Sequence, residues 1–499
     1  MRELIVGVDA GTSNIKSVAV TLEGTELVHA SRENEVQNPE TGWAEQDMAA
    51  TWERTAETMR EVTEQLGDDD EILAVGVTGQ GDGCWSIDAG GAPVGNAILW
   101  SDGRAADIVE EWNEDGTAAA IRERCGCDVF PGAPVTVVAW LARHRPDRFD
   151  RIETAFACKD WIKYRLTGVR ATDPTEAGLP YLDLTTDDYY DVDAVTGIQG
   201  VNEKLAPLVD PSEVVGHVTE PAAAATGIPV DTPVASGVFD IVASAYGSGA
   251  VEPGDSSSVV GTTSLNQTVL GAVPDSVEGS GFTFSLGNGR YLRTFASMAG
   301  TPNIDWLAEH LTDVEDLNEL EGRAESVPPG AEGVLYHPYL SGSGERAPFL
   351  KTTARAQLTG LSPEHTASNV IRAVYEGVAL AMRDCFEYMP TESDRVLMSG
   401  GGTRSELWCR IFANCLGTPV SIPEGSEFGA RGVALLAAVA VGEYPDIETA
   451  VRATTSVERT YEPDPEVAET YDVWYDVYRE AYEAMFGVWD ARAVALEEM

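Results

Sequence analysis

Two segments of the chain share one pattern, in which an apolar strand, a small polar turn and a second apolar strand follow one another. The first reads GVDAGTSNIKSVAV (residues 7–20) and the second reads SSSVVGTTSLNQTVL (residues 256–270). Apolar runs joined by a short turn rich in small residues are typical of β-hairpins. Because about 250 residues separate the two segments, they form a weak internal repeat, which indicates two related domains with a cleft between them.

The segments that follow each hairpin indicate an α/β fold. Residues 48–66 have helical spacing, and the apolar run ILAVGVTG at 72–79 ends at a glycine, as a buried strand does. After the second hairpin, helices are predicted at 303–311 and 368–389. This order of strands and helices is typical of a mixed sheet with helices on its faces.

The length of the chain fits two large domains, because single domains rarely exceed about 250 residues. The chain has 499 residues, and its segment GSGAVEPG at 247–254 is small and rich in turn-forming residues. We therefore predict an N-terminal domain over residues 1–248 and a C-terminal domain over residues 249–499.

The charge of the chain is strongly negative, since 82 acidic residues against 33 basic ones give −49. The acidic residues are spread along a chain that keeps its apolar segments, which favours a folded protein over disorder. A solvated acidic surface suits high salt, where self-repulsion is screened, and predicts a halophilic protein; an acidic mesophilic enzyme is the alternative. The absence of a basic stripe argues against nucleic acid as a partner.

The seven cysteines are scattered, and no second pair or histidine cluster accompanies the C-x-C of Cys125 and Cys127. This pattern predicts reduced thiols rather than a zinc site. The N-terminal MRELIVGVD leads directly into a strand, and the chain has no apolar run of the roughly 18 residues that a membrane span needs. We expect a cytoplasmic protein without a membrane partner.

The first turn, DAGTSN, carries groups that suit a nucleoside triphosphate with Mg²⁺. Gly11 allows close backbone approach, Thr12 and Ser13 offer hydroxyls, Lys16 adds a cation, and Asp9 can lie beside a metal ion. The turn is not a P-loop, because the pattern G-x-x-x-x-G-K-[ST] is absent. An ordinary hairpin is the alternative interpretation.

The second turn repeats this chemistry with Gly261, Thr262 and Thr263. A third glycine-rich segment lies between a predicted strand and a predicted helix and consists of Gly400, Gly401 and Gly402. A flat group such as adenine or ribose can lie against such a bare backbone near a helix N-terminus. The alternative is a flexible loop, although three successive glycines cost conformational entropy.

Asp240 follows a predicted strand and precedes a helix of small residues in GVFDIVASAYG. A carboxylate there can act as the general base that takes a proton from an attacking hydroxyl. A helix cap or a solvated turn is the alternative.

Two further loops, GQGDGCW and LWSDGRAAD, combine amide, carboxylate, guanidinium and indole groups that suit a polyol. The candidate acceptor-binding residues are Gln80, Asp82, Trp85, Asp102 and Arg104, together with Asp240. Each of them has a surface-loop alternative.

These segments, in this order, resemble the FGGY family of carbohydrate kinases over about residues 4–445. The segment GVDAGTSNIKSV is similar to the family's first phosphate motif, and GVFDIVASAYGSG with SSSVVGTTS is similar to the entry into its second domain. The segment beginning YLSGSGERAPFL resembles the family's C-terminal signature, and SGGGTRSELWCRIFANCLGTPV followed by EFGARGVALLA resembles its adenosine motif.

The resemblance implies two actin-like, ribonuclease-H-like domains with ATP and Mg²⁺ in the cleft, and closure of the cleft on substrate. By the same resemblance, Asp9 would help to position Mg²⁺ and Asp240 would be the base. The groups expected near the phosphates are Thr12, Ser13 and Lys16 from one domain and Thr262 and Thr263 from the other. The glycine triplet at 400–402 would lie behind the adenosine.

The resemblance says less about the acceptor than about the nucleotide site. Glycerol kinases carry an Arg-Glu pair where this chain has Gly81 and Asp82, and the Met-His of D-xylulose kinases is absent too. The surrounding segments resemble the erythritol kinase and the L-xylulose and 3-keto-L-gulonate kinase branches. We therefore expect a primary hydroxyl of a four- or five-carbon polyol or sugar as the acceptor.

Gly81 is expected to leave space beside Asp82, which keeps an already phosphorylated pentose such as ribose 1-phosphate open as an acceptor. Arg104 and Arg346 are the candidate cations for its phosphate, with surface ion pairs as the alternative. A non-catalytic sugar or nucleotide sensor on the same fold, an actin- or chaperone-like ATPase, and assembly as a homodimer stay open.

Overall fold

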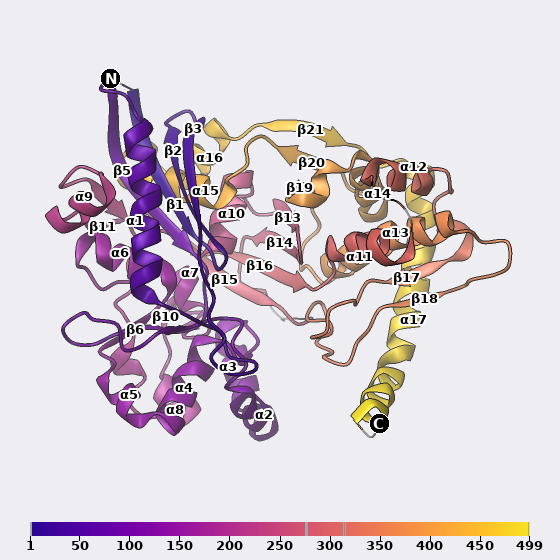
Figure 1. The fold of residues 1–499 in the computed structure, drawn as a ribbon, viewed down its shortest axis with the longest axis horizontal. Coiled ribbons are helices and arrows are strands. Elements are labelled where there is room, and N and C mark those ends of the chain that lie inside the picture. The colour runs from indigo at the N-terminus through magenta and orange to yellow at the C-terminus, as the bar shows by residue number, and fades with distance from the viewer. Residues whose placement is uncertain (1, 275–277, 313, 315, 498) are drawn as a thin grey trace.

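The computed structural model describes residues 2–274, 278–312, 314, 316–497 and 499, which form two lobes side by side (Figure 1). Each lobe is built on its own sheet. The sheet of the first lobe has the order β11-β12-β5-β1-β2-β3. Its strands are β1 (Arg2–Ala10), β2 (Asn14–Thr21), β3 (Glu26–Glu33), β5 (Asp70–Gly79), β11 (Val214–His217) and β12 (Pro233–Ala235).

The sheet of the second lobe has the order β15-β16-β14-β13-β19-β20-β21. Its strands are β13 (Ser256–Val260), β14 (Ser264–Leu270), β15 (Phe282–Gly287), β16 (Arg290–Ser297), β19 (Val396–Ser399), β20 (Val420–Pro423) and β21 (Val457–Tyr461). In each lobe an antiparallel hairpin, β1/β2 or β13/β14, lies beside a parallel strand, β5 or β19. The predicted repeat of two strand–turn–strand units is therefore confirmed.

Helices cover both sheets. Those of the second lobe are α11 (Pro302–Leu311), α12 (Leu317–Glu325), α13 (Ala367–Glu387), α14 (Glu406–Leu416) and α17 (Pro465–Glu497), so the helices predicted at 303–311 and 368–389 are confirmed. In the first lobe α1 (Met48–Gln65) packs on β2 and β3. The Asp47 carboxylate caps α1, since it accepts the backbone N–H groups of Ala49 and Ala50, and the apolar side of the helix faces the sheet through residues such as Trp52 and Met59.

The rest of the first lobe is a set of short elements beside and below the sheet in Figure 1. Its helices are α2 (Ala106–Asp115), α3 (Thr117–Cys125), α4 (Pro134–His144), α5 (Pro146–Arg151), α6 (Cys158–Thr167), α7 (Pro174–Ala177), α8 (Val192–Thr196) and α9 (Glu220–Thr226). Its strands are β4 (Glu45–Gln46), β6 (Trp85–Ile87), β7 (Ala97–Ile98), β8 (Thr154–Phe156), β9 (Leu182–Asp183) and β10 (Asp188–Tyr189). A further pair, β17 (Leu335–His337) and β18 (Gln357–Thr359), belongs to the second lobe.

Two helices join the lobes. Helix α10 (Asp240–Ser248) ends the first half of the chain, and α15 (Phe428–Ala440), followed by α16 (Ile447–Thr454), comes from the second half yet packs on β1 and β5. Glycines make this contact possible, because a Cβ at Gly7 would lie 1.9 Å from the Ala430 carbonyl oxygen and one at Gly76 would lie 2.0 Å from that of Val433. A division of the chain at residue 248 thus separates the two sheets, but not all of the helices that cover them.

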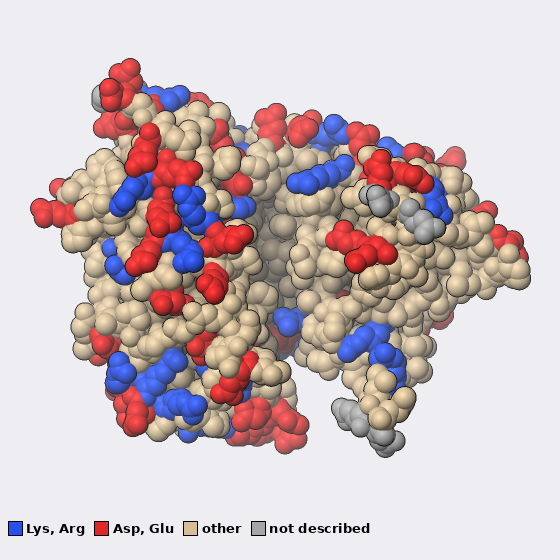
Figure 2. All heavy atoms as spheres, in the orientation of Figure 1, with Lys and Arg blue, Asp and Glu red and all other residues tan. Residues whose placement is uncertain are grey.

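The surface carries carboxylates over both lobes, and a groove runs between the lobes on the face in Figure 2. All seven cysteines lie among the described residues, and each is buried and free of a disulfide. Within that part of the chain, every helix is too short or too polar to cross a membrane.

Candidate active site

The first turn joins β1 to β2 and is tied to the acceptor loop by side chains. The Thr12 hydroxyl donates to Gln80 Oε1 and accepts from Trp100 Nε1, both at 2.9 Å. Gln46 completes the arrangement, since its Nε2 donates to the Thr12 carbonyl at 2.7 Å and its Oε1 accepts from Gln80 Nε2 at 2.6 Å. The structure thus brings the predicted phosphate turn and the predicted acceptor residue Gln80 together.

Asp9 and Lys16 are directly opposite each other in the β1/β2 hairpin. The Lys16 ammonium forms an ion pair with Glu427 Oε2 at 2.7 Å, at the residue that precedes α15. Burial raises the pKa of Asp9 to about 6, with the Lys16 charge opposing this shift and the Glu427 charge adding to it. A phosphate at this turn would therefore compete with Glu427 for Lys16.

The second turn leaves Thr262 and Thr263 exposed at the end of β13. The glycine triplet packs against the same strand end, because a Cβ on Gly400 would lie 2.5 Å from the Val260 carbonyl oxygen and one on Gly402 would lie 2.6 Å from Val260 Cγ1. Gly400 also has a φ of 90°, a conformation that favours glycine. The predicted second phosphate turn and the predicted adenosine loop are thus neighbours in the second lobe, with Gly400 and Gly401 exposed.

Asp240 is the first residue of α10, and its carboxylate accepts the N–H of Ile241 at the helix N-terminus. Burial and the nearby negative charge of Asp9 raise the pKa of Asp240 to about 8. This electrostatic coupling places the predicted base and the predicted metal ligand close together, although they come from β1 and from the segment after β12. With such a pKa the group is mostly protonated at pH 7, and its ionised form is a stronger base than an ordinary aspartate.

Asp82 lies close enough to Asp240 for their charges to interact, and it has a left-handed backbone with φ 57°. Burial and the Asp240 charge raise the pKa of Asp82 well above its usual range. A cavity of about 30 Å³ borders Asp82, Glu176 and Tyr181. Three buried oxygens of these side chains, Asp82 Oδ1, Glu176 Oε2 and the Tyr181 hydroxyl, have no hydrogen-bond partner among the described residues.

Gly81 does not leave the space that the sequence suggested. A Cβ at this position would lie only 1.4 Å from Cε2 of Phe239, so the ring of the residue before Asp240 fills that space. The expectation of room for a bulkier acceptor beside Asp82 was therefore wrong. The physical reason is a contact between two segments that the sequence alone does not show to be adjacent.

Three predicted acceptor residues are enclosed within the first lobe. Trp85 is fully buried in a hydrophobic cluster. The Arg104 guanidinium forms ion pairs with Asp102 at 2.8 Å and Glu45 at 2.7 Å and lies over the Trp43 ring. Asp102 also accepts the N–H of Ala44 at 2.6 Å. These contacts hold two loops together. Because two carboxylates neutralise the Arg104 guanidinium, it has no net positive charge left for a ligand phosphate.

Three residues of the site were not predicted from the sequence, namely Gln46, Phe239 and Glu427. Gln46 lies on a two-residue strand, and Glu427 reaches Lys16 from the opposite half of the chain. Of the three, only Phe239 could have been suspected from the sequence, because it is next to Asp240. Within the described residues, no group of three or more His, Cys, Asp or Glu side chains could hold a metal ion.

Behind the second turn, the Glu345 carboxylate is fully buried. Its Oε1 accepts the backbone N–H groups of Met298 at 2.9 Å, Arg346 at 2.8 Å and Ala347 at 3.2 Å. Met298 follows Ser297, which pairs with Ser264 at the end of the turn. Burial raises the pKa of Glu345 to about 7.

Glu345 should make the stability of the protein depend on pH. Because its pKa is higher in the folded than in the unfolded state, its contribution is fully present below the unfolded pKa of 4.5 and is lost as the pH rises through about 7. Between pH 5.5 and 8, the unfolding free energy of wild type should fall by about 2 kcal/mol more than that of Glu345→Gln. Urea unfolding of both proteins measures this, and equal pH dependence would contradict it.

The chain is similar to known carbohydrate kinases. Residues 4–247 match the N-terminal domain model of the FGGY family of carbohydrate kinases, and residues 257–441 match the C-terminal domain model. The chain is 32% identical to an erythritol kinase of Brucella abortus, over 98% of each chain. It is 28% identical to an L-xylulose/3-keto-L-gulonate kinase of Escherichia coli, again over 98% of each.

A solved structure shows the same fold. The xylulose kinase of Rhodospirillum rubrum superposes with a TM-score of 0.90 at 30% identity, over 98% of this chain and 100% of that one. Its two-lobed, actin-like architecture confirms the predicted fold class. The chain therefore belongs to the FGGY family of carbohydrate kinases, the enzymes that transfer a phosphoryl group from ATP to a sugar or polyol hydroxyl.

Proposed function

We propose that this kinase phosphorylates a primary hydroxyl of a four- or five-carbon polyol or ketose, with Asp240 as the general base. The observation that carries the proposal is that Asp9, Asp82 and Asp240 lie close together. The charge of Asp9 raises the pKa of Asp240, and the charge of Asp240 raises the pKa of Asp82. The names of the relatives support the acceptor class, since they include an erythritol kinase and an L-xylulose kinase.

In this mechanism, Asp240 accepts the proton of the acceptor hydroxyl as that oxygen attacks the γ-phosphorus of ATP. Asp82 binds a second hydroxyl of the acceptor and orients it. Thr262 and Thr263, whose side chains are exposed, and the turn at Thr12 would bind the phosphates from the two lobes. Positioning and charge neutralisation of this kind are what phosphoryl transfer requires of a protein.

Mg²⁺ fits the site as an ion that arrives with the nucleotide. It is commonly held by one or two carboxylates together with substrate phosphates rather than by an all-protein cage. Asp9 supplies one such carboxylate, and the described residues hold no larger cluster. When bound, the ion neutralises the charge of the phosphoryl oxygens, and its positive charge would lower the pKa of Asp9 and so keep that group ionised.

An acceptor screen tests the proposal. Purified protein with ATP and Mg²⁺ is given tetritols, pentitols, pentuloses, aldopentoses, glycerol and pentose phosphates, and ADP release is followed at low and at molar KCl. We expect turnover with a tetritol or a pentulose and little with glycerol. Turnover confined to a pentose phosphate would contradict the proposed acceptor class, and nucleotide binding without any turnover would favour a sensor.

A further inference from the structure

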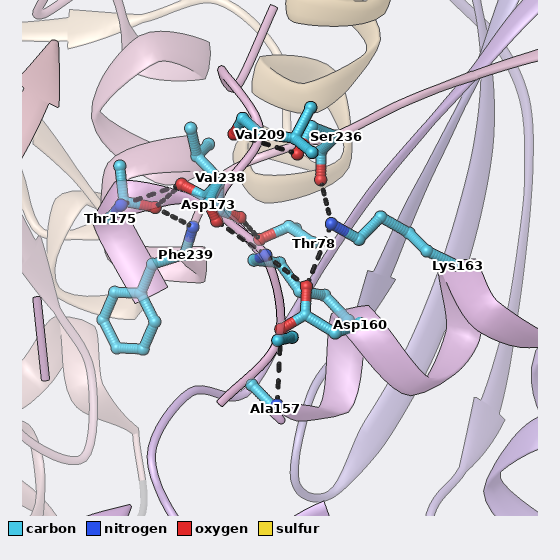
Figure 3. Close-up of polar contacts among 12 residues, drawn as sticks. Thr78, Ala157, Asp160, Lys163, Asp173, Thr175, Val209, Ser236, Val238 and Phe239 are labelled. Atoms are coloured by element: carbon cyan, nitrogen blue, oxygen red, sulfur yellow. Dashed lines mark hydrogen bonds and ion pairs between the residues drawn. The ribbon is translucent and has the colours of Figure 1, made fainter. Parts of the chain in front are cut away.

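Two of the five lysines in the chain, Lys159 and Lys163, are buried in the first lobe. Both belong to α6, and the Lys163 side chain projects toward Asp160 and Ser236 (Figure 3). The Lys159 ammonium lies 2.7 Å from Asp160 Oδ1 and 2.6 Å from Asp173 Oδ1, and that of Lys163 lies 2.9 Å from Asp160 Oδ1. Two ammonium groups and two carboxylates thus form one buried cluster, and the Glu176 carboxyl lies close enough for its charge to interact with Lys159.

This cluster holds the backbone just before Asp240. Lys163 Nζ donates to the Ser236 carbonyl at 2.6 Å. At the other end, Asp173 Oδ2 accepts from the Thr175 hydroxyl at 2.6 Å, and that hydroxyl accepts the Phe239 N–H at 2.8 Å. Side chains anchored in the cluster therefore bind both ends of the four-residue segment 236–239 (Figure 3).

A role in stability alone does not account for this cluster. Taking two ammonium groups out of water costs several kcal/mol for each ion, and apolar residues of similar volume often stabilise a core as well or better. Apolar residues cannot, however, donate to a carbonyl oxygen or orient a hydroxyl toward a backbone N–H. The cluster thus supplies fixed hydrogen-bond geometry next to the first residue of α10.

We propose that Thr175, Lys159 and Lys163 are positioning residues for the reaction, which fix the 236–239 segment so that the Asp240 carboxylate meets the acceptor hydroxyl. The inference rests on the proposed role of Asp240 as base. Thr175 is the last link of the cluster, because its hydroxyl accepts the backbone N–H of Phe239, the residue that precedes Asp240.

The variant Thr175→Val tests this with almost no change in volume. It removes the acceptor for the Phe239 N–H and should lower kcat at least tenfold, while the Kd for ATP stays within twofold of wild type. Thr175→Ser restores the hydroxyl and should recover most of kcat. All rates are measured well below the unfolding midpoint of each variant, so that lost turnover does not reflect lost folded protein.

Thr226→Val is the matched control. Thr226 is also buried, donates to the Ala222 carbonyl at 2.9 Å and accepts the Ile228 N–H at 3.2 Å, but it lies at the end of α9. It should lose stability and keep kcat. If Thr175→Val keeps kcat within twofold of wild type, or loses no more than Thr226→Val, the positioning role is overturned.

The variant Asp240→Asn distinguishes the positioning role from the role of Asp240 as the base. If Asp240→Asn abolishes turnover and Thr175→Val does not affect it, only the positioning role fails. If Asp240→Asn keeps near-normal turnover, the assignment of the base fails, and with it the reason to position that residue. Lys163→Met provides a second measurement: where it folds, kcat should fall with an unchanged Kd for ATP, and an unchanged kcat counts against the role.

Discussion

Replacing Asp240 with asparagine should lower kcat about 1,000-fold while ATP still binds. The asparagine has nearly the same shape, but its amide cannot take a proton, and a positioned general base contributes about 10²–10⁴-fold to such a reaction. The loss corresponds to about 4 kcal/mol in the barrier. Acceptor-dependent ADP release gives kcat, and titration with a nucleotide analogue gives the Kd.

Glu220→Gln is the control for this substitution, because Glu220 is likewise the acidic first residue of a helix in the first lobe, but it is exposed on α9. It reports what the loss of a carboxylate at a helix N-terminus costs in the absence of a catalytic role. We expect normal kinetics for it. If Asp240→Asn kept more than a tenth of wild-type kcat, another group would have to be the base.

Replacing Gly432 with alanine should destabilise the protein by about 3 kcal/mol. A Cβ at this position of α15 would lie 1.9 Å from the Ala243 carbonyl oxygen of α10, and this neighbour is backbone that cannot turn aside. The sign of the effect is informative, because alanine in a helix interior is normally favoured over glycine by about 1 kcal/mol. Urea unfolding followed by circular dichroism measures the difference.

Gly322→Ala should have the opposite effect on the stability of the protein. Gly322 lies inside α12, and a Cβ there would meet nothing within 4 Å. The intrinsic preference for alanine should then stabilise the protein by up to about 1 kcal/mol. If both variants were stabilised, the close crossing of α10 and α15 that joins the two lobes would not exist as described.

Much of this fold could be predicted because its signals are local. The two hairpins, the helix at 367–387 and the glycine triplet each lie within one short segment, and their pattern of apolar, polar and glycine residues is set by neighbours in sequence. Asp9 and Asp240 were predicted as site residues for the same reason, since each stands at the end of an apolar run.

The rest of the site depends on contacts between distant segments. The Phe239 ring fills the space at Gly81, and Glu427 pairs with Lys16 from the other end of the chain. Arg104 and Asp102 are residue types typical of a binding loop. In the folded protein, however, Arg104 pairs with Glu45 and Asp102 accepts the N–H of Ala44. Residue type shows what a side chain can bind, whereas the fold decides which partner lies within reach.

The reaction that we propose is transfer of the γ-phosphoryl group of ATP to a hydroxyl of a small polyol or ketose. Phosphorus-31 NMR of protein, ATP and Mg²⁺ with erythritol or L-xylulose tests it most directly. We expect a new phosphate monoester that accumulates in step with ADP, and only when an acceptor is present. ADP and inorganic phosphate formed at the same rate with or without acceptor would contradict it.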